Sequence, residues 1–95
     1  MSRTRYRSRV DQNQKDIMRE LRRLGATVID ASGVGRGFPD LVVGYQGRTF
    51  LLEVKNPERN GVLNLLQEKF FEDFRGEAYV AGTVDEAIEI LQPSA

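Results

Sequence analysis

Apolar residues recur every three or four positions over residues 11–24, where Ile17 and Leu21 fall on one helical face. This period predicts an amphipathic helix. Asp11 is expected to cap its start, because a short acidic side chain accepts hydrogen bonds from free N–H groups at a helix N-terminus. Gly25 is expected to end it.

Helical spacing returns twice later in the chain. Over residues 64–74, Leu66 and Phe70 share one face, and Asn64 is the expected cap. Residues 83–92 predict a short closing helix.

Short runs rich in Val, Leu and Phe between these helices are typical of strands. We expect strands over residues 26–30, 39–45, 48–55 and 77–82. Gln46-Gly47 separates the two central runs and is typical of a two-residue hairpin turn. The order α-β-β-β-α-β-α predicts an α/β sandwich.

The length of 95 residues allows one domain. We expect a flexible basic arm over residues 1–10 and a single domain over residues 11–95. No apolar run approaches the ~20 residues that a membrane span needs, which favours a cytoplasmic location.

The chain contains no Cys and no His. This excludes disulfides, thiolate or imidazole metal sites, and nucleophilic triads built on Cys or His. Any metal ion must be bound by oxygen, which favours Mg²⁺, Mn²⁺ or Ca²⁺ over zinc.

The net charge of zero hides an asymmetry, because the first ten residues carry four arginines and no acid. These are Arg3, Arg5, Arg7 and Arg9. Such an arm can contact a polyanion, or it can serve only as a solubilising tail.

The hairpin brings ionisable side chains together. With a two-residue turn, Tyr45 pairs with Arg48, and the same register places Asp40 opposite Glu53. Residues directly opposite share a face with Cβ atoms about 4.5 to 5.5 Å apart, and Lys55 points the same way as Glu53. Facing carboxylates repel, and a divalent cation offsets that repulsion. Alternatively, Glu53 and Lys55 form a surface pair and Asp40 only ends a loop; a longer turn also breaks the register.

The combination of "PD" at residues 39–40 with "EVK" at residues 53–55 resembles the PD-(D/E)XK nuclease signature. The stretch "GRGFPDLVVGYQGRTFLLEVK", after a helix beginning "DQNQ", resembles the virus-type replication-repair nuclease (VRR-NUC) family in its minimal stand-alone phage form. The resemblance covers about residues 11–82. It implies a restriction-endonuclease-like αβββαβ core with a mixed four-stranded sheet flanked by helices.

By this resemblance, Asp40 and Glu53 would bind Mg²⁺ or Mn²⁺ together with the backbone carbonyl of Val54. Lys55 would orient or activate the attacking water and stabilise negative charge on the phosphate. The implied activity is metal-dependent hydrolysis of phosphodiester bonds in DNA.

The chain departs from the family pattern at two places. Gln14 stands where the family usually has a metal-binding Glu, and Asp11 is the alternative ligand. Gln67 matches a catalytic Gln early in the second helix, preceded by Asn64 where the family has a hydroxyl residue; Glu68 is the alternative if the register shifts. Asn64 and Gln67 also have the spacing of a capping box, and both interpretations can hold.

The loop before Asp40 is rich in glycine, so backbone N–H groups of Gly35 could approach a phosphate, with Arg36 adding charge. Together with Arg7 and Arg9, these are the expected nucleic-acid contacts. A chain this small offers limited surface, so we expect a homodimer. Stand-alone members of the family resemble junction-resolving enzymes, which implies branched DNA, such as four-way junctions or flaps, as the partner, and two-fold symmetry would suit cutting two strands. The main rival is a catalytically weak or inactive module of the same fold that only binds nucleic acid.

Overall fold

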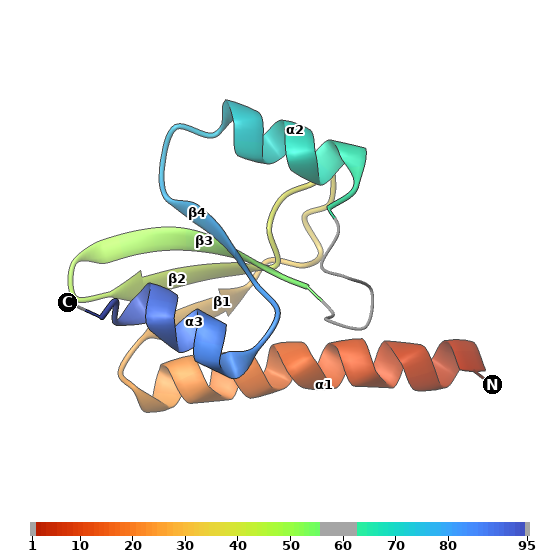
Figure 1. Cartoon of the computed structure of the whole chain (residues 1–95), viewed down its shortest axis with the longest axis horizontal. Coiled ribbons are helices and arrows are strands. Elements are labelled where there is room, and N and C mark those ends of the chain that lie inside the picture. Colours follow the sequence, from red (N-terminus) through yellow and green to blue (C-terminus); the bar gives the residue numbers. More distant parts are fainter. Residues whose placement is uncertain (1, 56–62, 95) are drawn as a thin grey trace.

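The computed structural model describes the backbone of residues 2–55 and 63–94, and the side chains of that part from residue 12 onwards. Within these ranges, seven elements follow one another (Figure 1). They are α1 (Ser2–Arg23), β1 (Thr27–Asp30), β2 (Leu41–Tyr45), β3 (Arg48–Val54), α2 (Leu65–Asp73), β4 (Ala78–Ala81) and α3 (Val84–Leu91). None of the helices in these ranges is long and apolar enough to cross a membrane.

The four strands form one mixed sheet in the order β1-β2-β3-β4. The first three strands are antiparallel neighbours, and β4 pairs parallel to β3 after the crossover through α2. Helices α1 and α3 lie on one side of the sheet, and α2 lies on the other (Figure 1). The predicted αβββαβ core with its mixed four-stranded sheet is confirmed.

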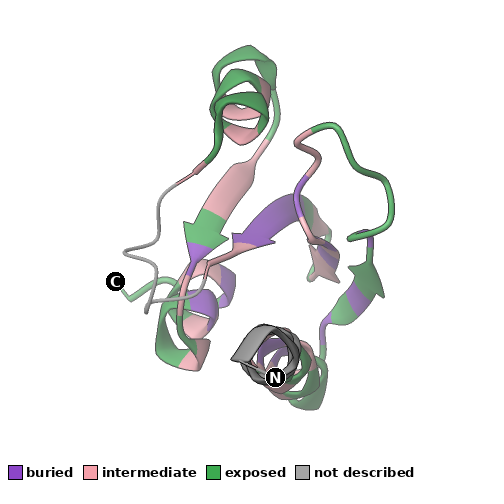
Figure 2. Cartoon of the chain, turned by 90° about the vertical axis from the view of Figure 1, so that its right-hand side faces the viewer, coloured by how far each residue is buried: buried purple, intermediate pink, exposed green. Residues whose placement is uncertain are grey.

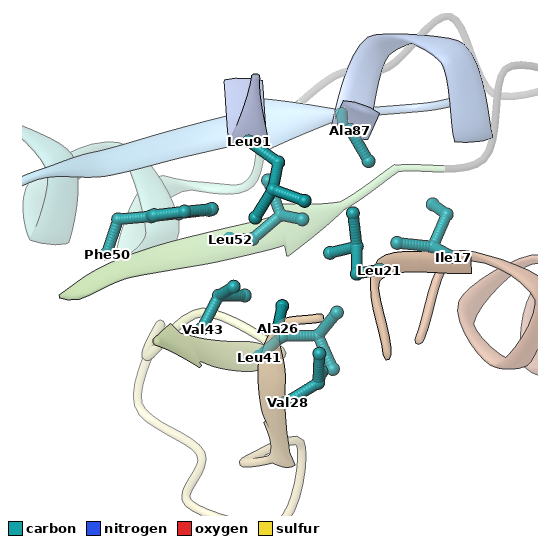
Figure 3. Packing of buried hydrophobic residues seen from close by; sticks show 11 residues of the cluster. Ile17, Leu21, Ala26, Val28, Leu41, Val43, Phe50, Leu52, Ala87 and Leu91 are labelled. Carbon is teal, nitrogen blue, oxygen red and sulfur yellow. The ribbon is translucent and has the colours of Figure 1, made fainter. Parts of the chain in front are cut away.

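The hydrophobic core lies between the sheet and the pair α1 and α3 (Figure 3). Alternate residues of the central strands point into it, because successive side chains of a strand face opposite sides of the sheet. Side chains of α1 and α3 close it from the other side. The buried cluster contains Ile17, Leu21, Ala26, Val28, Leu41, Val43, Phe50, Leu52, Ala81, Ala87 and Leu91.

Helix α1 begins at Ser2, so the predicted start at Asp11 was wrong. Residues 2–10 contain neither Gly nor Pro and are rich in Arg, a good helix former, so the backbone has no local reason to leave the helix. The end was predicted correctly. Gly25 has a φ of 102°, and the N–H of Ala26 donates to the carbonyl of Leu21 at 3.0 Å.

The hairpin between β2 and β3 has the predicted two-residue turn. Gln46 and Gly47 have φ angles of 49° and 79°, and two positive φ angles in succession are the mark of a type I′ turn. Tyr45 pairs with Arg48, and the register runs unchanged to Leu41 opposite Leu52. The register predicted from the sequence is therefore confirmed.

Helix α2 has the predicted cap at Asn64 but no buried residue. Leu66 is 61% exposed and Phe74 is 38% exposed, so the apolar face of α2 is not a core face. Helices α1 and α3 cover the core side of the sheet, whereas α2 lies on the other side with only Gln67, Phe70 and Phe71 half-buried. Figure 2 shows α2 standing at the edge of the molecule with most of its surface exposed. The edge of the Phe38 ring packs against Phe70, with ring centroids 5.4 Å apart.

Candidate active site

Asp40 and Glu53 meet at the open end of the hairpin, one position beyond the last ladder pair of β2 and β3. The backbone N–H of Val54 donates to Oδ2 of Asp40 at 2.9 Å. The N–H of Ala31 donates to the carbonyl of Asp40 at 2.7 Å. Both bonds fix Asp40 against neighbouring segments of the chain. The carboxyl group of Asp40 lies close enough to Glu53 for its charge to raise the pKa of Glu53, so the two acids converge as the register predicts.

Glu53 is a buried charged residue, only 3% exposed. Its Oε2 accepts a hydrogen bond of 2.8 Å from Nε2 of Gln67 and lies 3.5 Å from Nζ of Lys55. Among the described residues, no donor group hydrogen-bonds its buried Oε1, but the carboxyl groups of Glu53 and Asp40 lie within hydrogen-bonding reach of each other when one of them is protonated. An unpaired buried carboxylate oxygen is costly, so this atom is a candidate ligand for a cation.

The surroundings of both carboxyl groups favour the protonated form. Burial, and after it the charge of Asp40, raises the pKa of Glu53 to about 7 against the opposing effect of Lys55. Burial also raises the pKa of Asp40, although the hydrogen bond from the N–H of Val54 works in the opposite direction. Two desolvated acids side by side form a site that a divalent cation would stabilise.

Gln67 connects the cap of α2 to the acidic pair. Its Oε1 accepts from the backbone N–H of Asn64 at 3.0 Å and from Nζ of Lys55 at 2.7 Å. Its own N–H donates to Oδ1 of Asn64 at 2.9 Å, which completes a capping box. Glu68 is exposed. Gln67 therefore caps the helix and contacts Lys55 and Glu53 with the same side chain.

The backbone of Lys55 is held from two sides. Its N–H donates to the carbonyl of Ala81 at 2.9 Å. Its carbonyl accepts from Nδ2 of Asn13 at 3.4 Å, and the same Nδ2 donates to the carbonyl of Gly82 at 3.1 Å. Asn13 thus links α1 to the ends of β3 and β4. The sequence offered only its position beside Gln14 as a signal for this role.

Gln14 is half-buried and lies beside Asp30 at the end of β1. Hydrogen bonds from Ser32 lower the pKa of Asp30, and a further bond from Gln14 contributes. Asp30 is close enough for its charge to raise the pKa of Asp40. Within residues 12–55 and 63–94, no hydrogen bond joins Gln14 to Asp40, and no group of three or more His, Cys, Asp or Glu side chains is arranged to bind a metal.

The remaining predicted site residues belong to the exposed loop before Asp40 or to the first eleven residues. Gly35 and Arg36 are exposed in the loop that leads to Asp40, and Arg36 has a positive φ of 57°. The side chains of Arg7 and Arg9, and that of Asp11, lie outside the described part of the structure.

A shallow cavity of about 450 Å³ lies on the α1 side of β1. It is lined by Lys15, Met18, Arg19, Arg22 and Asp30. Arg19 forms an ion pair with Asp16 at 2.9 Å, and Arg22 donates to the carbonyl of Val28 at 2.7 Å. The cavity borders the candidate active site through Asp30.

A solved structure described as "VRR_NUC domain" is similar to this chain over nearly its whole length. The superposition has a TM-score of 0.72 and 26% sequence identity, and it covers 90% of this chain and 97% of the other. No family model and no curated protein matches the chain.

Proposed function

We propose that this chain, whose fold is that of a VRR-NUC domain, is a divalent-metal-dependent nuclease that hydrolyses phosphodiester bonds in DNA. The fold is of a nuclease type. The observation that carries the proposal is the buried side chain of Glu53: its Oε1 has no donor among the described residues, its Oε2 lies 3.5 Å from Nζ of Lys55, and its carboxyl group neighbours that of Asp40. Metal-assisted phosphodiester hydrolysis needs this combination of oxygen ligands and a nearby cation.

The carboxylates of Asp40 and Glu53 would bind Mg²⁺ or Mn²⁺, with the carbonyl of Val54 and the amide oxygen of Gln14 as further ligands. These donors are all oxygens, which both ions prefer. When bound, such an ion lowers the pKa of the attacking water and polarises the phosphoryl group.

Lys55 would supply positive charge where negative charge develops on the phosphate. Its ammonium group is oriented by the 2.7 Å hydrogen bond to Gln67 and by the nearby carboxylate of Glu53. Gln67 acts through these two residues and is therefore a positioning residue. Without it, the flexible side chain of Lys55 would sample several rotamers.

Arg36 and the backbone of Gly35 would contact the phosphate backbone next to the cleavage site, and Arg7 and Arg9 would contact it further along α1. The exposed position of the loop before Asp40 supports the contacts of Arg36 and Gly35. The arginine content of residues 1–10 supports the contacts of Arg7 and Arg9, because phosphate contacts by Arg dominate the affinity of nucleic-acid binding.

We further propose a homodimer that acts as a structure-selective endonuclease on branched DNA, such as four-way junctions or flaps. Leu65 is 83% exposed and Leu66 is 61% exposed, directly beside Gln67. Contiguous exposed apolar side chains such as these indicate an interaction surface when they form part of a larger patch. A two-fold axis would place one active site of the dimer at each of two DNA strands.

A cleavage panel tests the proposal. Single-stranded, duplex, flap and four-way DNA are incubated with the protein in Mg²⁺, in Mn²⁺ and in EDTA, with Asp40→Asn as the matched inactive variant. We expect cleavage of a branched substrate that requires the metal and Asp40. The presence of Gln14 in place of an acid favours the rival module that binds without cutting. That module is indicated if wild-type protein shifts DNA on a gel but does not cut it in Mn²⁺.

A further inference from the structure

Helix α2 is attached to the rest of the domain at few points. None of its residues is buried, and it lies on the side of the sheet opposite the main core. Its half-buried residues are Gln67, Phe70 and Phe71. The position of α2, and with it the position of Gln67, therefore depends on a small set of local contacts.

One of these contacts is made by Gly37. A Cβ added to Gly37 would lie 2.6 Å from the carbonyl carbon of Leu66 and 3.0 Å from the backbone nitrogen of Gln67, and it would overlap the carbonyl oxygen of Leu66. These atoms belong to the backbone of the first turn of α2, so they cannot rotate away as a flexible side chain could. The φ of Gly37 is +82°, a left-handed conformation that is a second, independent reason why residues other than glycine are disfavoured here.

The next residue makes a second contact with the same helix. The ring of Phe38 packs edge-on against Phe70, with centroids 5.4 Å apart and an interplanar angle of 71°. Phe70 lies three positions after Gln67, on the same side of α2. We name Gly37 and Phe38 the α2 seat.

The α2 seat touches the residue that holds the active site. Gly37 abuts the backbone of Gln67, and the side chain of Gln67 contacts both Lys55 and Glu53. Both hydrogen bonds are short, at 2.7 and 2.8 Å, and they would lengthen if the first turn of α2 moved outward.

We propose that Gly37 is a positioning residue of the active site, which acts by letting the backbone of Leu66 and Gln67 approach closely enough for Gln67 to hold Lys55 and Glu53. Its kinetic consequence rests on the proposed nuclease function, but its structural consequence does not. The close approach of α2 is therefore enough to require a glycine at position 37.

The test compares Gly37→Ala with Gly47→Ala. Gly47 has a φ of +79°, close to that of Gly37, and no atom within 4 Å of its added Cβ. Both substitutions carry a similar backbone strain, and only the first forces α2 away. The first measurement is the NMR signals of the side-chain NH₂ group of Gln67 and of the Lys55 ammonium group. The second is cleavage kinetics with the DNA substrate that the cleavage panel identifies.

We expect Gly47→Ala to leave the Gln67 signals unchanged. In Gly37→Ala they should move toward the positions of a solvent-exposed amide, and kcat should fall about 10- to 100-fold, the scale of a misplaced catalytic group, with KM nearly unchanged. In a Gln67→Ala background, Gly37→Ala should cause no further loss of kcat.

Unchanged Gln67 signals in Gly37→Ala, or losses that multiply in the double variant, overturn the proposal. If Gly37→Ala does not fold, Phe38→Leu decides the question, because it loosens the α2 seat without a clash. Movement of the Gln67 signals in Phe38→Leu supports the proposal, and their absence of movement contradicts it. If wild-type protein cuts no DNA, the proposed function fails and the NMR comparison still decides the role of Gly37.

Discussion

The backbone N–H of Val54 donates a 2.9 Å hydrogen bond to Oδ2 of Asp40, next to the side chain of Glu53. The carboxylate before β2 is thus fixed by the backbone of β3. The distance between the two acids is set by the hairpin itself, so a catalytic pair can be built on a rigid ladder.

The pH dependence of stability should report the burial of Glu53. Its pKa is about 7 in the folded protein and 4.5 for the free side chain, so the folded state binds the proton more tightly. Stability contributed by this group is therefore present below pH 4.5 and is lost as the pH rises toward 7. Glu53→Gln should raise the free energy of unfolding at pH 8 by as much as about 3 kcal/mol and much less at pH 5.

Urea unfolding of wild type and Glu53→Gln in EDTA measures this difference at both pH values. A difference that is the same at pH 5 and pH 8 would contradict the prediction. With Mn²⁺ in excess, wild type should gain stability and Glu53→Gln should gain less, because only the wild type keeps both carboxylate ligands.

The hairpin shows how much the sequence can determine. Gln46-Gly47 specifies a turn with two positive φ angles, and the turn specifies which residues lie opposite each other. From this local information the pairing of Asp40 with Glu53 follows without any tertiary knowledge. The capping interaction between Asn64 and Gln67 could be predicted for the same reason, because both partners lie within one turn.

Features that depend on tertiary packing could not be predicted. The period of α2 indicates an apolar face, but not that α1 and α3 already occupy the core side of the sheet. The contact of Gly37 with Leu66 joins a loop to a helix that is distant in sequence. The hydrogen bond from Asn13 to the carbonyl of Lys55 likewise joins α1 to the distant end of β3. The start of α1 was missed because Asp11 has the side chain of a cap, while residues 2–10 contain no signal that ends a helix.

Removing the ammonium group of Lys55 should strongly slow the proposed DNA cleavage and leave metal binding intact. Lys55→Ala is expected to reduce cleavage about 10²- to 10³-fold, the usual loss for one group that stabilises transition-state charge. Calorimetric titration should show Mn²⁺ binding retained. Lys69→Ala is the matched control, because Lys69 is exposed and pairs only with Asp73, at 3.2 Å, among the described residues. Activity retained in Lys55→Ala would remove Lys55 from the mechanism.

The two capping boxes allow the structural and functional roles of α2 to be separated. Asn64→Ala and Thr83→Ala each remove a cap side chain that accepts from the N3 backbone, and each should cost about 1 kcal/mol of stability. Only Asn64→Ala should also lower kcat, because only its capping partner Gln67 contacts Lys55. Thermal unfolding and kinetics of both variants test this expectation. Equal kcat values in the two variants would mean that the cap of α2 is only structural.

A substitution in the hairpin turn should increase the stability of the protein. Gln46 is a non-glycine residue with a φ of 49°, a conformation that Asn adopts more readily. Gln46→Asn should therefore raise the free energy of unfolding slightly without changing cleavage. Urea unfolding measures the gain. A loss of stability would show that the 3.3 Å hydrogen bond from Gln46 to the hydroxyl of Tyr45 matters more than the turn.

The arginines of residues 1–10 should be visible in the salt dependence of DNA binding. Deletion of this segment is expected to weaken binding and to reduce the slope of log K against log salt by about 0.9 for each phosphate that the arginines neutralise. Fluorescence anisotropy at several salt concentrations measures the slope. A slope equal to that of the full chain would assign the segment to solubility alone.

The sheet order also has a consequence for the order in which the candidate site assembles during folding. Strands β1, β2 and β3 are sequential antiparallel neighbours, whereas β4 joins only after the chain has crossed through α2. Local pairings of the first kind form early during folding, and the parallel pairing costs more loop closure and forms later. Asp40 and Glu53 belong to the early meander, but Gln67 and the Ala81 carbonyl that holds Lys55 come from the late crossover. If the proposed function holds, a folding intermediate that lacks α2 and β4 would therefore contain Asp40 and Glu53 without the contacts that hold Lys55, and we expect such an intermediate to cleave DNA poorly.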